Sequence, residues 1–195
     1  MTSIKVYKTI YTSPIGQLSL VATDKALTGA WFLGQKYYEA KLEDADVQKS
    51  TNPILAEAVS WLDAYFAGSS LPSKPALSPI GTPFQQKVWQ VLATIPQGSV
   101  MTYGEIADCL GCQSAQAVGG AVGRNPLSIF IPCHRVLRST GELTGYAGGL
   151  DKKIWLLEHE GVHLKKQPFL TKKENTCYNF TNTRLARLVS EPKKS

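Results

Sequence analysis

The residues best suited to chemistry stand together near position 133, where the apolar run 129–132 ends in Cys133, His134 and Arg135. A cysteine reacts as its thiolate, and a neighbouring histidine or arginine favours that form. A lone cysteine is more often an unreactive small residue of the core. In an extended chain adjacent side chains point to opposite faces, so Cys133 and His134 would need a bridging water or a sharp bend to act together. The stretch therefore indicates a candidate nucleophilic cysteine, Cys133, whose thiolate the neighbouring His134 and Arg135 can favour.

Signals for a metal or a cofactor are weaker than the signal at position 133. Cys109 and Cys112 form a C-x-x-C pair, but no second pair of ligands has zinc-site spacing, and all three histidines lie at 134 or beyond. The glycines at 141, 145, 148 and 149 match neither a dinucleotide-binding motif nor a P-loop, and they indicate a loop near the reactive cysteine. We therefore expect neither a bound metal nor a cofactor.

The first part of the chain has the patterns of a sheet and one helix. Short strands are predicted at 4–11, 17–22 and 27–33, and the turn-like residues 23–25 favour antiparallel pairing of the last two. Asn52 and Pro53 predict the cap and first position of a helix that ends at Gly68. Its apolar face, which we expect to cover the sheet, consists of Leu55, Val59, Leu62 and Phe66.

The second part has the patterns of several short helices. The Ser, Pro and Gly content of 68–79 predicts a linker and a domain boundary. Capping boxes at 82–85 and 102–105 predict two helix starts, and a further helix is expected at 114–123. A short helix, a Gly-containing turn and a second helix make the outline of a helix-turn-helix. The small residues of 114–123 fit either a close approach to DNA or tight packing against another helix.

Length and composition exclude several classes of protein. With 195 residues, 43% of them hydrophobic and 18% charged, the chain can form one or two small domains. It contains no apolar run long enough to cross a membrane, and its first residues lack the pattern of a secretory signal. We therefore expect a protein of the cytoplasm, or of the nucleus if the source is eukaryotic, with reduced cysteines and no membrane partner.

The positive charge is concentrated at the end of the sequence. The net charge is +6, and the segment 165–195 has eight basic residues against two acidic ones. Such a tail suits a polyanionic partner, although it can also be a solvated end or a structural extension of the body. The stretch 109–141, which has Arg124, Arg135 and Arg138 but no acidic residue, favours the same kind of partner.

Together these motifs resemble those of the O6-alkylguanine-DNA alkyltransferases, also called methylated-DNA–protein-cysteine methyltransferases. The resemblance covers essentially all of 80–161 in the family's order and spacing, whereas 1–78 match only in general character. The matching motifs are 82–84 with Trp89, 102–107, 117–121, 125–126, 131–136, 145–149 and 155–161.

The resemblance implies both a fold and an activity. The fold class is α/β (α+β), with a small ribonuclease H-like sheet-plus-helix domain at 1–78, a mainly helical winged-helix or helix-turn-helix domain at 79–164, and the basic tail at 165–195. The implied activity is DNA repair by a single, irreversible transfer of an alkyl group from O6-alkylguanine to Cys133, with O4-alkylthymine left open as a second substrate. No cofactor is implied.

The resemblance also implies the roles of the site residues. Cys133 would accept the alkyl group, and His134 would remove the thiol proton through a water while Glu160 orients the imidazole. Tyr103 would help to rotate the target nucleotide and donate a hydrogen bond to the departing guanine. Asn125 would tie the DNA-binding helix to the turn that holds Cys133.

The implied partner is double-stranded DNA with alkylated bases, bound by a monomer. An O6 substituent inside the base stack is out of reach of a protein sulfur, so the nucleotide must leave the helix. The implied DNA contacts are Thr102, Ala115, Gln116, Gly119, Arg124 and Arg135. The implied lining of the base pocket is Val136, Tyr146, Ala147 and Gly148.

One residue departs from the family's pattern. Members commonly have an arginine at the position of Gln116, inserted into the duplex where the flipped base was. Glutamine can fill that space and form hydrogen bonds, but it has no charge for a cation–π contact. Arg124 lies elsewhere on the expected helix and is not assumed to substitute for it. We therefore expect less efficient base flipping.

Three other functions fit the sequence less well. Alkyltransferase-like proteins bind the same lesions without repairing them, but they lack the acceptor cysteine that Cys133 provides here. A papain-like hydrolase would have its cysteine and histidine far apart in sequence. A regulatory DNA-binding protein would have base-reading side chains in its recognition helix, and the segment 114–123 has few.

Overall fold

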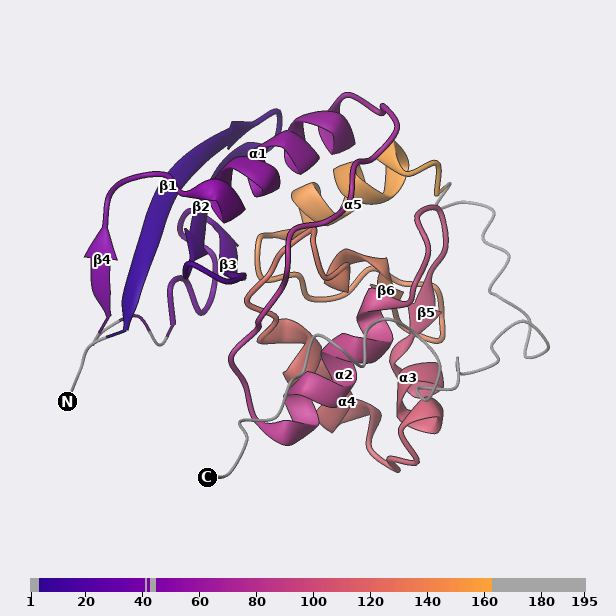
Figure 1. The fold of residues 1–195 in the computed structure, drawn as a ribbon. Coiled ribbons are helices and arrows are strands. Elements are labelled where there is room, and N and C mark those ends of the chain that lie inside the picture. The colour runs from indigo at the N-terminus through magenta and orange to yellow at the C-terminus, as the bar shows by residue number, and fades with distance from the viewer. Residues whose placement is uncertain (1–3, 41, 43–44, 163–195) are drawn as a thin grey trace.

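The computed structural model describes residues 4–40, 42 and 45–162, so the basic tail at 165–195 lies outside the described part of the chain. The elements in chain order are β1 (Lys5–Ser13), β2 (Gly16–Ala22), β3 (Leu27–Phe32), β4 (Asp46–Gln48), α1 (Pro53–Phe66), α2 (Pro83–Ala93), β5 (Met101–Thr102), α3 (Tyr103–Cys109), α4 (Ala115–Gly123), the 3₁₀ turn η1 (Cys133–Arg135), β6 (Val136–Leu137) and α5 (Leu150–His159). Figure 1 shows the sheet and α1 on one side and α2, α3 and α4 on the other, which confirms the predicted fold class. Of the helices described, none has both the length and the apolar character needed to cross a membrane.

The N-terminal sheet has the strand order β3-β2-β1-β4. The three predicted strands are present, and β2 pairs antiparallel with β1 and with β3. The sequence does not predict β4, which runs parallel to β1 and has no buried residue to mark it. Leu18 and Leu20 of β2 point to the same face because side chains alternate along a strand, and both are fully buried.

Helix α1 covers one face of this sheet, as predicted (Figure 1). Its N-terminus is fixed by Asn52, whose side chain accepts a hydrogen bond from the amide of Leu55 at 2.9 Å. The buried surface of the helix is wider than the predicted stripe, because Trp61 and Tyr65 are also buried, at 2% and 1% exposure. Trp61 packs against Phe130 of the second half, with ring centroids 4.9 Å apart. The helix therefore contacts both halves of the molecule.

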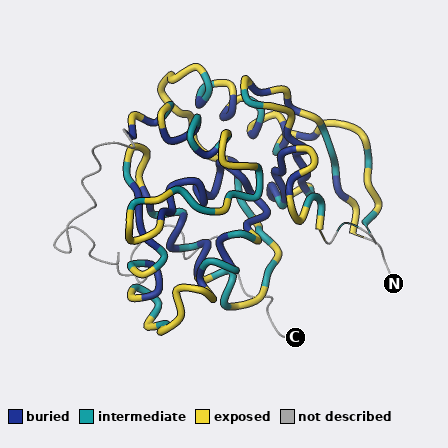
Figure 2. Tube along the Cα trace, turned by 180° about the vertical axis from the view of Figure 1, so that it is seen from behind, coloured by how far each residue is buried: buried dark blue, intermediate teal, exposed yellow. Residues whose placement is uncertain are grey.

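The free edge of β3 is covered by segments from outside the sheet. The linker pairs with it through Leu27, whose amide donates to the carbonyl of Ala76 and whose carbonyl accepts from the amide of Ser78, each at 2.8 Å. Farther along the strand, Ala30 bonds in the same way to the segment 126–128, at 2.8 and 2.9 Å. An edge covered in this way cannot pair with another chain. One cluster of buried residues contains members from both halves, and Figure 2 shows buried segments on either side of residue 78. The boundary at 78/79 therefore stays a prediction.

The second half begins with the two predicted capping boxes. The hydroxyls of Thr82 and Thr102 accept from the amides of Gln85 and Glu105, each at 3.2 Å, and open α2 and α3. Helices α3 and α4 form the predicted helix-turn-helix, and both pack against α2. The small residues of α4 serve this packing, because the indole of Trp89 in α2 donates to the carbonyl of Ala121 at 2.9 Å. The first turn of α4 is nevertheless exposed, so the structure keeps both explanations of its composition.

Candidate active site

Cys133 lies at the start of a tight turn rather than in an extended strand. The chain is buried from residue 125 to residue 137, and Ile129 adopts a φ of 73°, which is rare for a β-branched residue and requires strong packing around it. The 3₁₀ turn Cys133–Arg135 follows directly after Pro132. This is the sharp bend that the sequence left open as a way to bring Cys133 and His134 into one site. Cys133 itself is 7% exposed.

Asn125 connects the helix-turn-helix to this turn. It follows α4, and its amide nitrogen donates to the carbonyl of Ile131 at 2.8 Å and to the Cys133 sulfur at 3.1 Å. Its side-chain oxygen accepts from the amide of Leu127 at 3.0 Å. Burial raises the pKa of the Cys133 thiol, while the hydrogen bond from Asn125 acts in the opposite direction. The net direction is upward, so the thiol needs a base to become nucleophilic.

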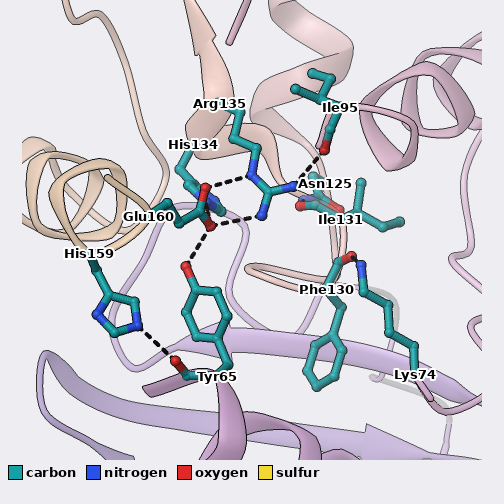
Figure 3. A network of polar contacts seen from close by, with 10 residues as sticks. All are labelled: Tyr65, Lys74, Ile95, Asn125, Phe130, Ile131, His134, Arg135, His159 and Glu160. Atoms are coloured by element: carbon teal, nitrogen blue, oxygen red, sulfur yellow. Dashed lines mark hydrogen bonds and ion pairs between the residues drawn. The ribbon is translucent and has the colours of Figure 1, made fainter. Parts of the chain in front are cut away.

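His134 and Arg135 both bind the carboxylate of Glu160 (Figure 3). His134 Nε2 lies 2.8 Å from Oε1, and Arg135 donates from Nε to Oε2 at 2.7 Å and from its NH2 group to Oε1 at 2.8 Å. Burial alone would raise the pKa of Glu160, but the hydrogen bonds from His134 and Arg135 outweigh it and hold that pKa well below its usual range. Glu160 is therefore an ionised acceptor at neutral pH.

This arrangement sets the tautomer of His134. Burial lowers the pKa of the imidazole despite the contact with Glu160, so the ring is neutral at pH 7. An ionised carboxylate can only accept a hydrogen bond, so the single ring proton lies on Nε2 and the lone pair on Nδ1. Nδ1 is buried and has no hydrogen-bond partner among the described groups. The turn thus contains a buried thiol and, on the next residue, a buried base with a free lone pair.

Arg135, for which the resemblance implied a DNA contact, points into the protein. Its side chain is buried, and besides Glu160 it donates from its NH1 group to the carbonyl of Ile95 at 2.6 Å. All three guanidinium nitrogens of Arg135 donate to acceptors inside the protein, so this group cannot also reach a phosphate. Its physical role is to balance the buried charge of Glu160.

Thr102 and Val136 also differ from their implied roles. The Thr102 hydroxyl is engaged inside the protein, where it caps α3 and donates to Glu105 at 3.0 Å, and the residue is 8% exposed. Val136 is fully buried in the core at 0% exposure, so its side chain has no open surface toward a pocket. The implied contacts at these two positions are therefore not available to the side chains as the structure has them.

Several implied DNA contacts do meet at one surface depression. It has a volume of about 430 Å³ and is lined by Tyr103, Gly104, Ala115, Gln116, Gly119, Arg138, Ser139 and Thr144. The sequence reasoning missed Arg138 as a site residue, although its place in the acid-free stretch 109–141 was a usable signal. Arg124 is exposed and lies outside the lining, with its guanidinium 5.0 Å from the ring centre of Tyr37.

The loop at 144–149 lies against β3 and the Cys133 segment. The Tyr146 hydroxyl is buried without a hydrogen-bond partner among the described residues, and burial raises its pKa well above the usual value. A Cβ on Gly148 would lie 2.8 Å from Phe32 and 2.9 Å from the Tyr146 ring, so only glycine fits there. Ala147 accepts a hydrogen bond from the Lys36 amide at 3.3 Å.

Lys153 is a buried residue that the sequence did not reveal. Its ammonium donates to the carbonyls of Val136 at 2.6 Å and Thr144 at 2.9 Å, and so fixes the loop to the Cys133 segment. Burial lowers its pKa to about 8. A lysine in a charged helix normally indicates a solvent-exposed face, which is why no local signal distinguishes it. Within the described ranges no group of three or more His, Cys, Asp or Glu residues is placed to hold a metal.

The chain is similar to known proteins over nearly its whole described length. A family model described as 6-O-methylguanine DNA methyltransferase, ribonuclease-like domain, matches residues 6–79, and the DNA binding domain of the same family matches residues 83–162. The methylated-DNA–protein-cysteine methyltransferase of Mycobacterium leprae is 46% identical over 149 residues, which are 76% of this chain and 88% of that protein. Its counterpart from Methanosarcina acetivorans is 43% identical over 157 residues, 80% of this chain and 99% of that protein.

Solved structures show the same similarity. The O6-methylguanine methyltransferase of Mycobacterium tuberculosis matches with a TM-score of 0.70 at 41% identity and covers 84% of this chain and 95% of that one. The M. tuberculosis OGT in complex with DNA matches with a TM-score of 0.70 at 40% identity and covers 80% of this chain and 92% of that one. These matches agree with the sheet-plus-helix and helix-turn-helix halves described above.

Proposed function

The chain belongs to the 6-O-methylguanine DNA methyltransferase family, and on this premise we propose which of its residues carry out the reaction. It is an enzyme of direct DNA repair, which transfers an alkyl group from DNA to one of its own cysteines, and its partner is DNA. We assign the acceptor as Cys133. The observation that carries this assignment is the buried turn that holds the thiol beside a neutral His134, with Glu160 bound to the far side of the imidazole.

The transfer begins with removal of the thiol proton. The proton passes through one water to Nδ1 of His134, the nitrogen whose lone pair is free. The imidazolium that forms is stabilised by the ionised carboxylate of Glu160 at 2.8 Å. The hydrogen bond from Asn125 stabilises the thiolate at the same time. These contacts act against the burial that raises the pKa of the thiol.

The sulfur then attacks the alkyl carbon attached to O6 of guanine. The S–C bond forms as the C–O bond breaks, and the electron pair of the C–O bond stays on the guanine. A hydrogen bond from Tyr103 stabilises the departing anion, and a proton from water restores neutral guanine. The hydroxide that this leaves takes the proton back from the His134 imidazolium, so that His134 is neutral again. The thioether has no proton to lose and is not converted back, so each chain reacts once.

The depression beside α4 is the surface on which we expect the damaged duplex to lie. Its lining joins Tyr103 to the exposed first turn of α4, where Ala115 and Gln116 can approach the DNA closely. Arg138 lies at the rim with 61% of its side chain exposed, and its guanidinium forms an exposed ion pair with Glu142 at 3.6 Å. The target is double-stranded DNA with an alkylated base turned out of the helix, bound by one copy of the chain. We therefore place the protein where DNA is found, in the cytoplasm or nucleus.

A lesion-binding protein without transfer activity is the alternative that the sequence left open. The family assignment and the relatives named above favour transfer, because those relatives are methyltransferases. Cys133 also has the hydrogen-bonded setting that a nucleophile requires, rather than that of an inert core residue.

Peptide mapping by mass spectrometry tests the assignment of the acceptor. After incubation with O6-methylguanine DNA, we expect one added methyl group on the peptide that contains Cys133. The Cys133→Ala variant should lose transfer but still bind the lesion, because the helix-turn-helix supplies the contacts. Cys112→Ala is the matched control, since Cys112 is partly exposed and lies before α4. A methyl group on another residue of the wild-type chain would overturn the assignment.

A further inference from the structure

A hydroxyl group from the N-terminal half takes part in the buried network around Glu160. Tyr65, in the last turn of α1, donates a hydrogen bond of 2.7 Å to Oε1 of Glu160. The same oxygen lies 2.8 Å from Nε2 of His134 (Figure 3). Glu160 therefore connects the tyrosine of one half of the molecule to the histidine of the other.

Tyr65 is held in this position by its surroundings. Its ring stacks on Trp61, with centroids 5.4 Å apart and planes inclined by 13°, and only 1% of the residue is exposed. Its backbone carbonyl accepts a hydrogen bond of 2.7 Å from Nε2 of His159, the residue that precedes Glu160 in the chain. Burial raises the pKa of the phenol, and the adjacent carboxylate raises it further. The hydroxyl thus stays protonated and acts as a donor throughout the physiological pH range.

We propose that Tyr65 is a positioning residue for alkyl transfer, which fixes Oε1 of Glu160 and, by sharing its negative charge, sets the basicity of His134. The inference rests on the roles proposed above for His134 and Glu160. It adds the N-terminal half to the active site as a contributor to proton transfer, in addition to its part in the common core.

The direction of the effect follows from the groups that face the pair. His134 is surrounded by the carboxylate of Glu160, the guanidinium of Arg135 and the ammonium of Lys153. Glu160 additionally faces the Tyr65 hydroxyl, the phenol of Tyr146, and the ammonium of Lys74, which comes from the linker. Of these, the Tyr65 hydroxyl can be removed without changing any formal charge.

Without the hydroxyl, Oε1 of Glu160 loses one donor and its negative charge is less well satisfied. The carboxylate then attracts the imidazolium form of His134 more strongly, so the pKa of His134 rises. A protonated His134 cannot accept the thiol proton. The transfer rate of the variant should therefore begin to fall at a higher pH than that of the wild type as the solution is acidified.

Single-turnover methyl transfer at saturating DNA, measured between about pH 5 and pH 9, tests this inference. For Tyr65→Phe we expect the acid limb of the rate profile to move to higher pH. A movement of about one pH unit would make the rate on that limb about tenfold lower. Tyr11→Phe is the matched control. The Tyr11 hydroxyl is likewise buried and donates a hydrogen bond of 2.8 Å to a carboxylate of α1, that of Asp63, but it does not contact Glu160. Its profile should superimpose on that of the wild type.

A second variant covers the case in which Tyr65→Phe does not fold. Replacing Tyr65 with 3-fluorotyrosine keeps the ring and makes the hydroxyl a stronger donor, so the acid limb should move to lower pH. The inference is overturned if neither substitution moves the limb, or if Tyr11→Phe moves it equally. Because the wild-type rate is measured in the same experiment, failure of the proposed function would appear separately, as absence of transfer by the wild-type chain.

Discussion

The side-chain nitrogen of Asn125 lies 3.1 Å from the Cys133 sulfur and 2.8 Å from the carbonyl oxygen of Ile131, so one amide holds both the proposed nucleophile and the backbone of its turn. Asn125 follows directly after the C-cap of α4, and it thereby joins the expected DNA-binding helix to the reactive group.

Replacing Asn125 with alanine should therefore affect both stability and rate. The variant loses buried hydrogen bonds to Ile131, Leu127 and Cys133, and we expect the free energy of unfolding to fall by about 2 kcal/mol. The transfer rate should fall as well, because the thiolate loses its donor. Denaturant unfolding and single-turnover transfer measure the two effects. Asn52→Ala is the control, since it removes a buried cap of α1 that is not connected to Cys133. If the two variants transferred methyl groups at equal rates, the role of Asn125 would be purely structural.

Glu160→Gln should change how stability depends on pH. The pKa of Glu160 in the folded protein lies below the ordinary value of 4.5, so its stabilising contribution is fully present above about pH 4.5 and is lost as the pH falls through the folded-state pKa. Glutamine does not titrate, so the decline in unfolding free energy on acidification should be shallower in the variant. At neutral pH the variant should be less stable by about 3–5 kcal/mol, because Arg135 keeps a buried charge without a partner. Urea unfolding at several pH values measures both quantities. If the unfolding free energies of the variant and the wild type fell equally steeply with acidification, the account would be contradicted.

The same variant should transfer methyl groups more slowly. The glutamine amide cannot stabilise an imidazolium as a carboxylate does, so His134 becomes a weaker proton acceptor. The measurement is the single-turnover rate at saturating DNA. If Glu160→Gln reacts at the wild-type rate at every pH at which it is folded, proton transfer does not pass through His134.

Gln116→Arg should favour extrusion of the base. Gln116 is exposed on the first turn of α4 and lines the depression beside Tyr103, where an arginine side chain could enter the duplex. We expect the repair rate on duplex DNA to rise more than the rate on a free modified base, which needs no flipping. Gln113→Arg, an exposed position before α4 and outside the lining, controls for the added charge. Equal gains on both substrates would show that flipping does not limit the rate.

Gly148→Ala should disturb the loop that packs against Cys133. Its new methyl group would lie 2.8 Å from Phe32 and 2.9 Å from Tyr146, both of which are held by packing. We expect a loss of about 1–3 kcal/mol in unfolding free energy. Gly123→Ala is the matched control, because it lies in α4 with open space around it and should stabilise the helix by up to about 1 kcal/mol. Thermal melting compares the two; equal melting temperatures would mean that the loop adjusts freely.

Local chemistry made much of this fold predictable. Asn52, Thr82 and Thr102 cap their helices through contacts within three residues, so the sequence alone identified α1, α2 and α3. The three longer strands are rich in apolar, aromatic and β-branched residues, whereas β4 has only three residues, none of them buried. Elements defined by local signals were therefore predicted, whereas the short strands defined by their partners, namely β4 and the pair β5 and β6, were not.

The active site depends on contacts that no local pattern encodes. Arg135 stands in a basic stretch and was expected at the DNA surface, but the fold turns it toward Glu160, 25 residues away in the chain. Tyr65 reaches the same carboxylate across 95 residues. Lys153 belongs to a helix with charged neighbours and is nevertheless fully buried. Such roles require the tertiary structure, since each follows from the meeting of two distant segments.

The central claim, one irreversible transfer to Cys133, is tested most directly by intact-mass measurement after mixing the protein with an excess of O6-methylguanine duplex. The account predicts that the wild-type chain gains a single methyl group and then stops, however long the incubation, and that Cys133→Ala gains none. An unchanged mass of the wild-type chain, continued removal of methyl groups beyond one per chain, or a methylated Cys133→Ala variant would contradict it.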